Sequence, residues 1–268
     1  MRASGTGRTF LMLQGPHGPF FRQLGRMLRA TGAAVWRVGF NGGDAVFWAD
    51  PASYIPFRDA PEAWPDACAA ILRDRGITDL VLYGDTRPVH AQAAECARAR
   101  GITVHVFEEG YLRPYWSTYE RGGANGNSRL MSMGVNRMQG ALHGLDIEAP
   151  EAPSHWGDMR QHIFWGAAYH WCVMTGSRGY CGYRPHRGLT VRAEFGLYLR
   201  RILAMPFHRW ERMLAEARIR SGGFPYHLVL LQLEHDASFR MHSPFRSLAE
   251  FIDLVMAGFA AGAATHHH

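Results

Sequence analysis

The sequence contains no lysine, since all 29 of its basic residues are arginine. GC-rich codon usage produces the same bias, so we draw no function from this absence alone. Long apolar runs are also missing near the N-terminus, where the run from Phe10 to Leu13 has four residues and ends at Gln14. A membrane-spanning helix needs about 20 apolar residues, so this stretch predicts neither a span nor a signal peptide.

Cysteine is scarce, with four residues and no C-x-x-C pair. Cys68 and Cys96 fall within predicted helices, which indicates reduced thiols in a cytoplasmic protein. The sequence also lacks D-x-D and has no His, Cys or carboxylate cluster with metal-ligand spacing. It therefore predicts that the protein works without a metal.

Acidic residues are few in one long segment. Residues 156–220 hold eleven Arg against four acids, whereas the remainder of the chain is near neutral within a net charge of +6. A localised basic segment indicates an anionic partner, such as a phosphate group, a nucleotide, an acidic sugar or an anionic lipid surface. Nucleic acid is not favoured, because Trp165, Tyr169 and Trp171 do not alternate with Arg on a strand and no recognised motif is present.

The first half of the chain alternates apolar strands with helices. This order predicts an α/β fold with a parallel, doubly wound, Rossmann-like sheet. The expected strands are residues 9–13, 34–40, 79–83 and 102–107, and the expected helices are 20–30, 60–75 and 88–100.

A polar turn follows each expected strand. The turns are Gln14 to His17, Asn41 to Asp44, Gly84 to Arg87 and Glu108 to Arg113. One such turn alone is usually an ordinary surface turn, but the carboxyl ends of parallel strands share one edge, so four together favour a binding crevice. The run from Gln14 to Pro19 does not match G-x-G-x-x-G, and its two prolines lack N–H donors, so a dinucleotide fingerprint is not favoured there.

The richest of these turns lies within residues 104–128. An apolar strand leads directly into Glu108, Glu109 and Arg113, and a Gly/Asn-rich run that is not expected to form regular structure follows at Gly122 to Asn127. Ionisable groups at a strand's carboxyl end indicate a site, although a solvated loop held by an ion pair has the same residues.

The second half is less regular. Helices are expected over residues 163–174 and over 190–220, the latter with at most one break near Pro206. The first of them suits either a membrane interface or a packed core. After Gly222 and Gly223, a strand over 226–233 and a helix over 245–258 predict the first β-α unit of a second sheet domain, which a lone strand and helix leave incomplete.

These spaced motifs together resemble one family, the capsular polysaccharide biosynthesis and export proteins of the KpsS type, whose members are retaining β-Kdo glycosyltransferases. The resemblance covers most of the chain and keeps the motifs in order. The motifs are Gln14 to Pro19, Asn41 to Asp44, Glu108 to Arg113, Asn125 to Ser128, Pro185 to Arg187, Gln232 to Asp236 and His242 to Pro244.

The resemblance implies a GT-B-like architecture that acts without a cofactor. Residues 1–150 would form the acceptor-side domain, 151–222 an Arg-rich helical connection, and 223–268 the start of the domain for the donor CMP-Kdo. The implied acceptor is a phosphatidylglycerol-type lipid at the inner membrane, where Kdo begins the capsule linker. A non-catalytic capsule export or assembly protein that binds lipid, polysaccharide or other assembly proteins is the alternative.

Site residues follow from the same resemblance. Gln232 and Asp236 match a Gln and an Asp at the active site of related Kdo transferases, where the Asp is the nucleophile. Glu108 and Glu109 begin a motif that has Asp at the second position in relatives, and either is a candidate general base. The family's later His-Pro motif for the donor has no counterpart before His268, so this chain is expected to be inactive by itself.

The remaining candidates are residues expected to bind substrate. Arg113 would pair with a phosphate or with the Kdo carboxylate. His17 and His242 are weaker candidates, because a structural hydrogen bond at a turn explains each of them equally well. The other members of this set are Gln14, Asn41, Asp44, Asn125, Asn127 and Ser243.

Overall fold

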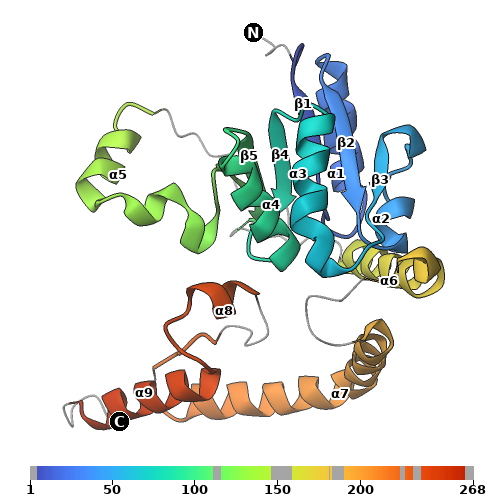
Figure 1. Cartoon of the computed structure of the whole chain (residues 1–268). Coiled ribbons are helices and arrows are strands. Elements are labelled where there is room, and N and C mark those ends of the chain that lie inside the picture. The colour runs from blue at the N-terminus through green and yellow to red at the C-terminus, as the bar shows by residue number, and fades with distance from the viewer. Residues whose placement is uncertain are drawn as a thin grey trace. The chain divides into compact units, whose positions relative to one another are not determined.

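The computed structural model describes residues 5–110, 116–145, 159–180, 182, 190–223, 227–231 and 237–262. The chain divides into two compact units, Met1–His186 and Arg187–His268. Figure 1 shows the helices and strands of each. The division predicted from the sequence, into 1–150, 151–222 and 223–268, stays a prediction. The helix at 159–176, which falls in the middle segment, belongs to the first compact unit.

The first unit is built on a six-stranded sheet with the order β3-β2-β1-β4-β5-β6. All neighbouring strands are parallel except β5 and β6. The predicted α/β, Rossmann-like sheet is confirmed and is compatible with a GT-B fold, whereas the short β3 and the antiparallel β6 were not predicted. The strands are β1 (Thr9–Met12), β2 (Ala34–Gly39), β3 (Tyr54–Pro56), β4 (Asp79–Tyr83), β5 (Thr103–Glu109) and β6 (Ser117–Arg121).

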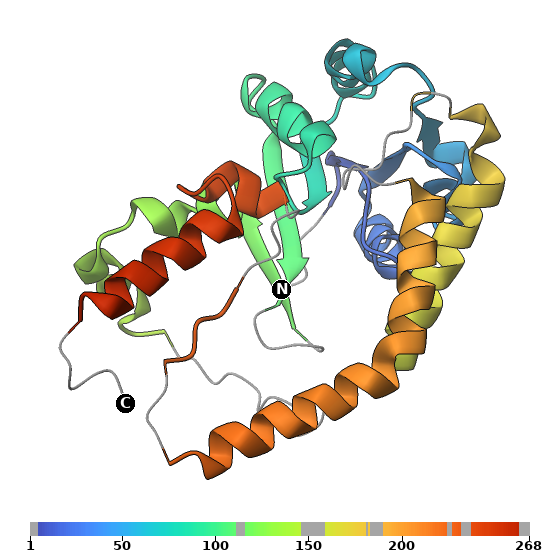
Figure 2. The ribbon, with the colours of Figure 1, turned by 90° about the horizontal axis from the view of Figure 1, so that it is seen from below.

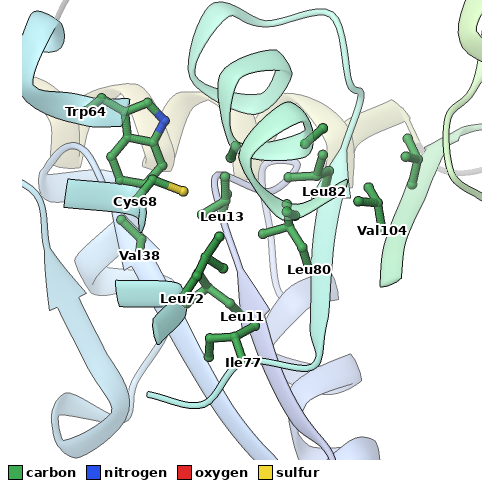
Figure 3. Close-up of a cluster of buried hydrophobic side chains, with 14 of the residues drawn as sticks. Leu11, Leu13, Val38, Trp64, Cys68, Leu72, Ile77, Leu80, Leu82 and Val104 are labelled. Carbon is green, nitrogen blue, oxygen red and sulfur yellow. The ribbon is translucent and has the colours of Figure 1, made fainter. Parts of the chain in front are cut away.

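Alternation along the strands divides the apolar side chains between two faces. Leu11, Leu80 and Val104 lie on the face covered by α3 and α4, where they join one buried cluster (Figure 3). Phe10 and Val81 point the other way and pack with Phe21 of α1. The three predicted helices of this half are confirmed as α1 (Phe20–Ala30), α3 (Trp64–Asp74) and α4 (Pro88–Arg98).

Three further helices and five 3-10 turns complete the described part of the first unit. Helix α6 lies against the segment that contains α2, as both ribbon views show (Figures 1 and 2). The helices are α2 (Gly42–Val46), α5 (Val135–Leu142) and α6 (Met159–Gly176). The 3-10 turns are η1 (Pro51–Ser53), η2 (Pro61–Ala63), η3 (Asn125–Asn127), η4 (Arg129–Ser132) and η5 (Ser177–Gly179).

The second unit is helical where it is described, with α7 (Val191–Ser221), α8 (Ala237–His242) and α9 (Leu248–Ala260). Helix α7 passes through Pro206 without a break. The predicted strand over 226–233 is wrong for residues 227–231, which form none. A strand needs a hydrogen-bonded neighbour, and the described residues of this unit offer no strand beside this segment. None of the described helices has the length and apolar character that crossing a membrane requires.

A charged cluster ties the sheet together at the start of β4. Asp79 is buried and accepts hydrogen bonds from Arg8 Nε at 3.0 Å and from Thr78 Oγ1 at 2.6 Å. His105 Nε2 lies 2.7 Å from Asp79 Oδ1, and its Nδ1 lies 2.7 Å from the Tyr119 hydroxyl. Burial raises the pKa of Asp79, but the hydrogen bonds from Arg8, Thr78 and His105 outweigh it and leave this pKa below its ordinary value.

We expect the stability of the first unit to depend on pH through Asp79. Because the pKa is lowered on folding, the ionised form contributes stability above the unfolded pKa of about 3.9, and this contribution is lost as pH falls through the folded pKa. Hydrogen exchange of the β1 and β4 amides between about pH 2 and 6 should show that Asp79→Asn flattens this dependence. Asp74→Asn, at a carboxylate whose side chain is 60% exposed, is the control. Equal pH slopes in wild type and Asp79→Asn would contradict the assignment.

Candidate substrate-binding edge

The described residues of the predicted polar turns do lie along one edge of the sheet, at or after the carboxyl ends of its strands. Strands β1 and β4 are neighbours in the sheet. The chain continues from β1 to β2 on one side of this pair, and from β4 to β5 on the other side. Such a reversal is the topological switch point at which open α/β sheets bind ligands. Gln14 follows β1 at this point, and Asp85, Thr86 and Arg87 follow β4.

Helix α2 begins at this edge because Asn41 caps it. The Asn41 side chain accepts a hydrogen bond from the Asp44 N–H at 2.9 Å, as a helix N-cap does. The Asp44 carboxylate accepts from the Phe40 N–H at 3.0 Å and from Arg37 Nη2 at 3.2 Å. Asp44 and Arg37 are 0% and 2% exposed, so they form a buried ion pair whose charges cancel.

Tyr169 of α6 joins these residues to Gln14. Its hydroxyl accepts hydrogen bonds from Asn41 Nδ2 at 2.9 Å and Gln14 Nε2 at 3.0 Å, and donates to Asp44 Oδ1 at 3.2 Å. Tyr169 was not among the predicted site residues, and its position 125 residues after Asp44 gave no local signal. We call the buried set of Gln14, Arg37, Asn41, Asp44 and Tyr169 the edge network.

Arg87 extends the edge network across the switch point. Its Nη1 donates to Gln14 Oε1 at 3.1 Å. The Gln14 amide has one orientation that satisfies all its neighbours: Nε2 faces the Tyr169 oxygen and the Asp44 carboxylate, and Oε1 faces Arg87. A guanidinium is thus held beside a neutral amide.

His17 lies over the edge network and is exposed. Its ring stacks on Tyr169 with centroids 4.5 Å apart and meets His170 edge-on at 5.1 Å. The structure therefore brings together four predicted residues from two separate turns, namely Gln14, His17, Asn41 and Asp44. Asn41 and Asp44 are fully buried, so their side chains support the edge from below, whereas His17 faces solvent.

Helix α6 packs tightly against α2. The Gly42 N–H donates to Ser177 Oγ at 3.2 Å, and the Tyr54 and Tyr180 hydroxyls lie 2.9 Å apart. Burial and the hydrogen bond with Tyr180 hold the pKa of Tyr54 above its ordinary value, so Tyr54 stays neutral. Tyr169 and Val173 of α6 are buried, so one face of this helix is packed as expected, whereas Ile163, Phe164 and Trp171 are exposed and contact with a membrane interface stays a prediction.

Glu108 and Glu109 form the end of β5, where they pair with Thr118 and Ser117 of β6. As neighbours on a strand they point to opposite faces of the sheet. Glu108 is half-buried on the face shared by Val106, and its Oε1 lies 3.1 Å from the position that a Cβ on Gly84 would occupy. Glu109 is exposed. Glu108 is therefore the carboxylate that lies beside the end of β4.

Asp85 anchors the Gly/Asn-rich run beside the same strand end. It is 1% exposed, and its Oδ2 accepts from the Ala124 N–H and from Asn127 Nδ2, both at 3.1 Å. Asn125 adopts a left-handed conformation, with φ of 52°, inside the 3-10 turn η3. The run has a defined shape because Asp85 holds it, a residue that sequence reasoning placed in a turn but did not identify as part of the site.

Arg113, Gln232 and Asp236 fall outside the described residues. His242 ends α8 in the second unit, and Ser243 Oγ accepts from the Phe245 N–H at 3.1 Å in a local turn. Within the described ranges, no three His, Cys, Asp or Glu side chains are grouped so that they could hold a metal ion.

Comparison with known protein families identifies residues 78–267 as a match to the model described as "Capsule polysaccharide biosynthesis protein". The chain is similar to the capsule polysaccharide export protein KpsS of Escherichia coli, with 28% identity over 95% of this chain and 64% of KpsS. It is also similar to the capsule polysaccharide modification protein LipB of Neisseria meningitidis serogroup B, with 29% identity over 95% of this chain and 61% of LipB. The chain thus spans about three fifths of the length of these curated relatives.

Proposed function

Because the chain belongs to the capsule polysaccharide biosynthesis protein family, we propose that it is part of a retaining β-Kdo transferase. The enzyme would move Kdo from CMP-Kdo to a phosphatidylglycerol-type lipid and so begin the linker that carries the capsule. The observation that carries this proposal is the family match combined with a carboxylate, Glu108, at the ligand-binding edge of a Rossmann-like sheet.

Retention of configuration follows from two successive inversions. In the first, the Asp236 carboxylate attacks the anomeric carbon of Kdo, the bond to the phosphate oxygen breaks, and CMP leaves. In the second, an acceptor hydroxyl attacks the same carbon, its proton passes to a general base, and the bond to Asp236 breaks. Gln232 would orient Asp236 or the sugar carboxylate.

Glu108 is the better candidate for the general base. It is half-buried and lies beside Gly84 at the end of β4, whereas Glu109 is exposed and points to the opposite face. Arg113 would pair with a phosphate or with the Kdo carboxylate. Helix N-termini and Arg side chains would balance the charge of the departing phosphate without a metal.

The lipid acceptor places the enzyme at the cytoplasmic face of the inner membrane in this proposal. The basic segment 156–220 would lie near anionic headgroups. Each Lys or Arg near such a surface contributes about 1 kcal/mol to the free energy of membrane binding. Other capsule assembly proteins are further proposed partners.

A second candidate function is favoured by the name of one relative, the capsule polysaccharide export protein KpsS. In this alternative the chain would bind lipid or polysaccharide for capsule export without forming or breaking a glycosidic bond. The sheet edge would then be a binding surface only.

Incubation of the full-length protein with CMP-Kdo and a fluorescent phosphatidylglycerol tests the proposal. We expect a product whose mass exceeds that of the lipid by one Kdo residue, and no product when CMP-Kdo is omitted or phosphatidylcholine replaces the acceptor. Folded protein that binds the lipid but forms no product would support the export alternative instead.

A further inference from the structure

Arg87 is the cationic side chain that follows β4 at the switch point. Its guanidinium donates one hydrogen bond, from Nη1 to the neutral Gln14 amide at 3.1 Å, and no carboxylate of the described residues forms an ion pair with it. Asp44 pairs with Arg37. Asp85, two residues before Arg87, accepts at its Oδ2 from the run that contains Asn127, and its buried Oδ1 has no hydrogen-bond partner among the described residues.

The edge network determines which atom of the Gln14 amide faces Arg87. Gln14 presents its oxygen to Arg87 because its nitrogen is occupied by Tyr169 and Asp44. Arg37 cancels the charge of Asp44 within the buried layer, and the other members of the network are neutral. The edge network therefore does not offset the charge of Arg87, a half-buried guanidinium at the switch point, where the nearby carboxylates are Asp85 and Glu108 at the end of β4.

We propose that Arg87 binds the phosphodiester of the lipid acceptor, an inference that rests on the proposed transferase function. One of its nitrogens holds Gln14, and the remaining N–H groups match two oxygens of a phosphodiester in the paired geometry that guanidinium favours. A partly desolvated site strengthens this pairing relative to one in open water. Gln14 and Tyr169 are positioning residues for Arg87 and do not touch the ligand.

Binding of water-soluble dihexanoyl phosphatidylglycerol to the full-length protein tests this assignment directly. We expect Arg87→Gln to weaken binding by about 10- to 100-fold, the usual effect of losing hydrogen bonds to a charged group, and to leave CMP-Kdo binding unchanged. Arg87→Lys should give an intermediate loss because it keeps the charge without the paired geometry. Arg100→Gln is the matched control, since Arg100 is exposed and lies beyond the opposite end of α4.

Kinetics separate this inference from the proposed function itself. Wild-type turnover is measured first, and its absence would remove the transferase proposal. If wild type turns over, we expect Arg87→Gln to raise KM for the lipid, and Tyr169→Phe to raise the same KM by a smaller factor because Arg87 loses its support. Unchanged lipid affinity and KM in folded Arg87→Gln, or a loss of CMP-Kdo affinity in place of lipid affinity, would overturn the assignment of Arg87.

Discussion

Replacement of Asp236 with alanine is expected to lower kcat for Kdo transfer by a factor on the order of 10⁴ or more. Loss of a covalent nucleophile in an enzyme has effects of this size, because the remaining groups still bind and orient the substrates but cannot form the intermediate. Steady-state kinetics of the full-length protein, with CMP-Kdo and the fluorescent lipid, measures the change. Glu108→Gln should lose less, about 10² to 10⁴, as expected for a general base.

The intermediate provides an independent measurement of the same prediction. With CMP-Kdo and no acceptor, the wild-type protein should gain the mass of one Kdo residue, and Asp236→Ala should not. Asp253→Ala is the matched control, because it removes an exposed carboxylate on α9 of the same unit and should leave turnover and labelling unchanged. Turnover by Asp236→Ala at the wild-type rate would exclude Asp236 as the nucleophile.

The second large effect is expected for the fold. Alanine at Gly42 would place its Cβ 2.6 Å from the carbonyl carbon of Gly176 and 2.7 Å from the Cys172 oxygen. Both are backbone atoms of α6, so no side chain can rotate away and the helix itself must move. We expect a loss of roughly 3 kcal/mol in the free energy of unfolding of the first unit, at the upper end for overpacking.

Urea denaturation and hydrogen exchange of α6 measure this loss. Displacement of α6 would also separate Tyr169 from Gln14 and Asn41, so the α6 amides should lose protection first. Gly140→Ala is the control, because Gly140 is helical and has no atom within 4 Å of its Cβ position. Alanine there should stabilise by up to about 1 kcal/mol. Wild-type stability in Gly42→Ala would show that α6 does not depend on this close approach.

Much of the first unit could be predicted from the sequence because its signals are local. Apolar runs such as Thr9–Met12 and Asp79–Tyr83 are buried on both faces, and glycines such as Gly76 end the helices, here with φ of 57°. The polar residues that follow each strand were predicted to share an edge, and the parallel pairing places them there.

The rest depended on contacts that a linear pattern does not contain. Asn41 and Asp44 were expected to bind a ligand in a turn. They are instead buried, and they hydrogen-bond to Tyr169, which lies far along the chain. In the sequence Asp85 is an ordinary turn carboxylate, and its role depends on the hydrogen bond from the Ala124 N–H, 39 residues later. Residues 227–231 are apolar enough for a strand, but pattern alone does not supply a hydrogen-bonded neighbour.

The two outermost strands of the sheet have a consequence for self-association. Strand β3 has three residues and ends in Pro56, which lacks an N–H, while β6 carries Glu120 and Arg121. Edge strands that are short, charged or contain proline disfavour the addition of a strand from another chain. The sheet therefore resists edge-to-edge aggregation at both sides, which matters for an enzyme proposed to be concentrated on a membrane surface.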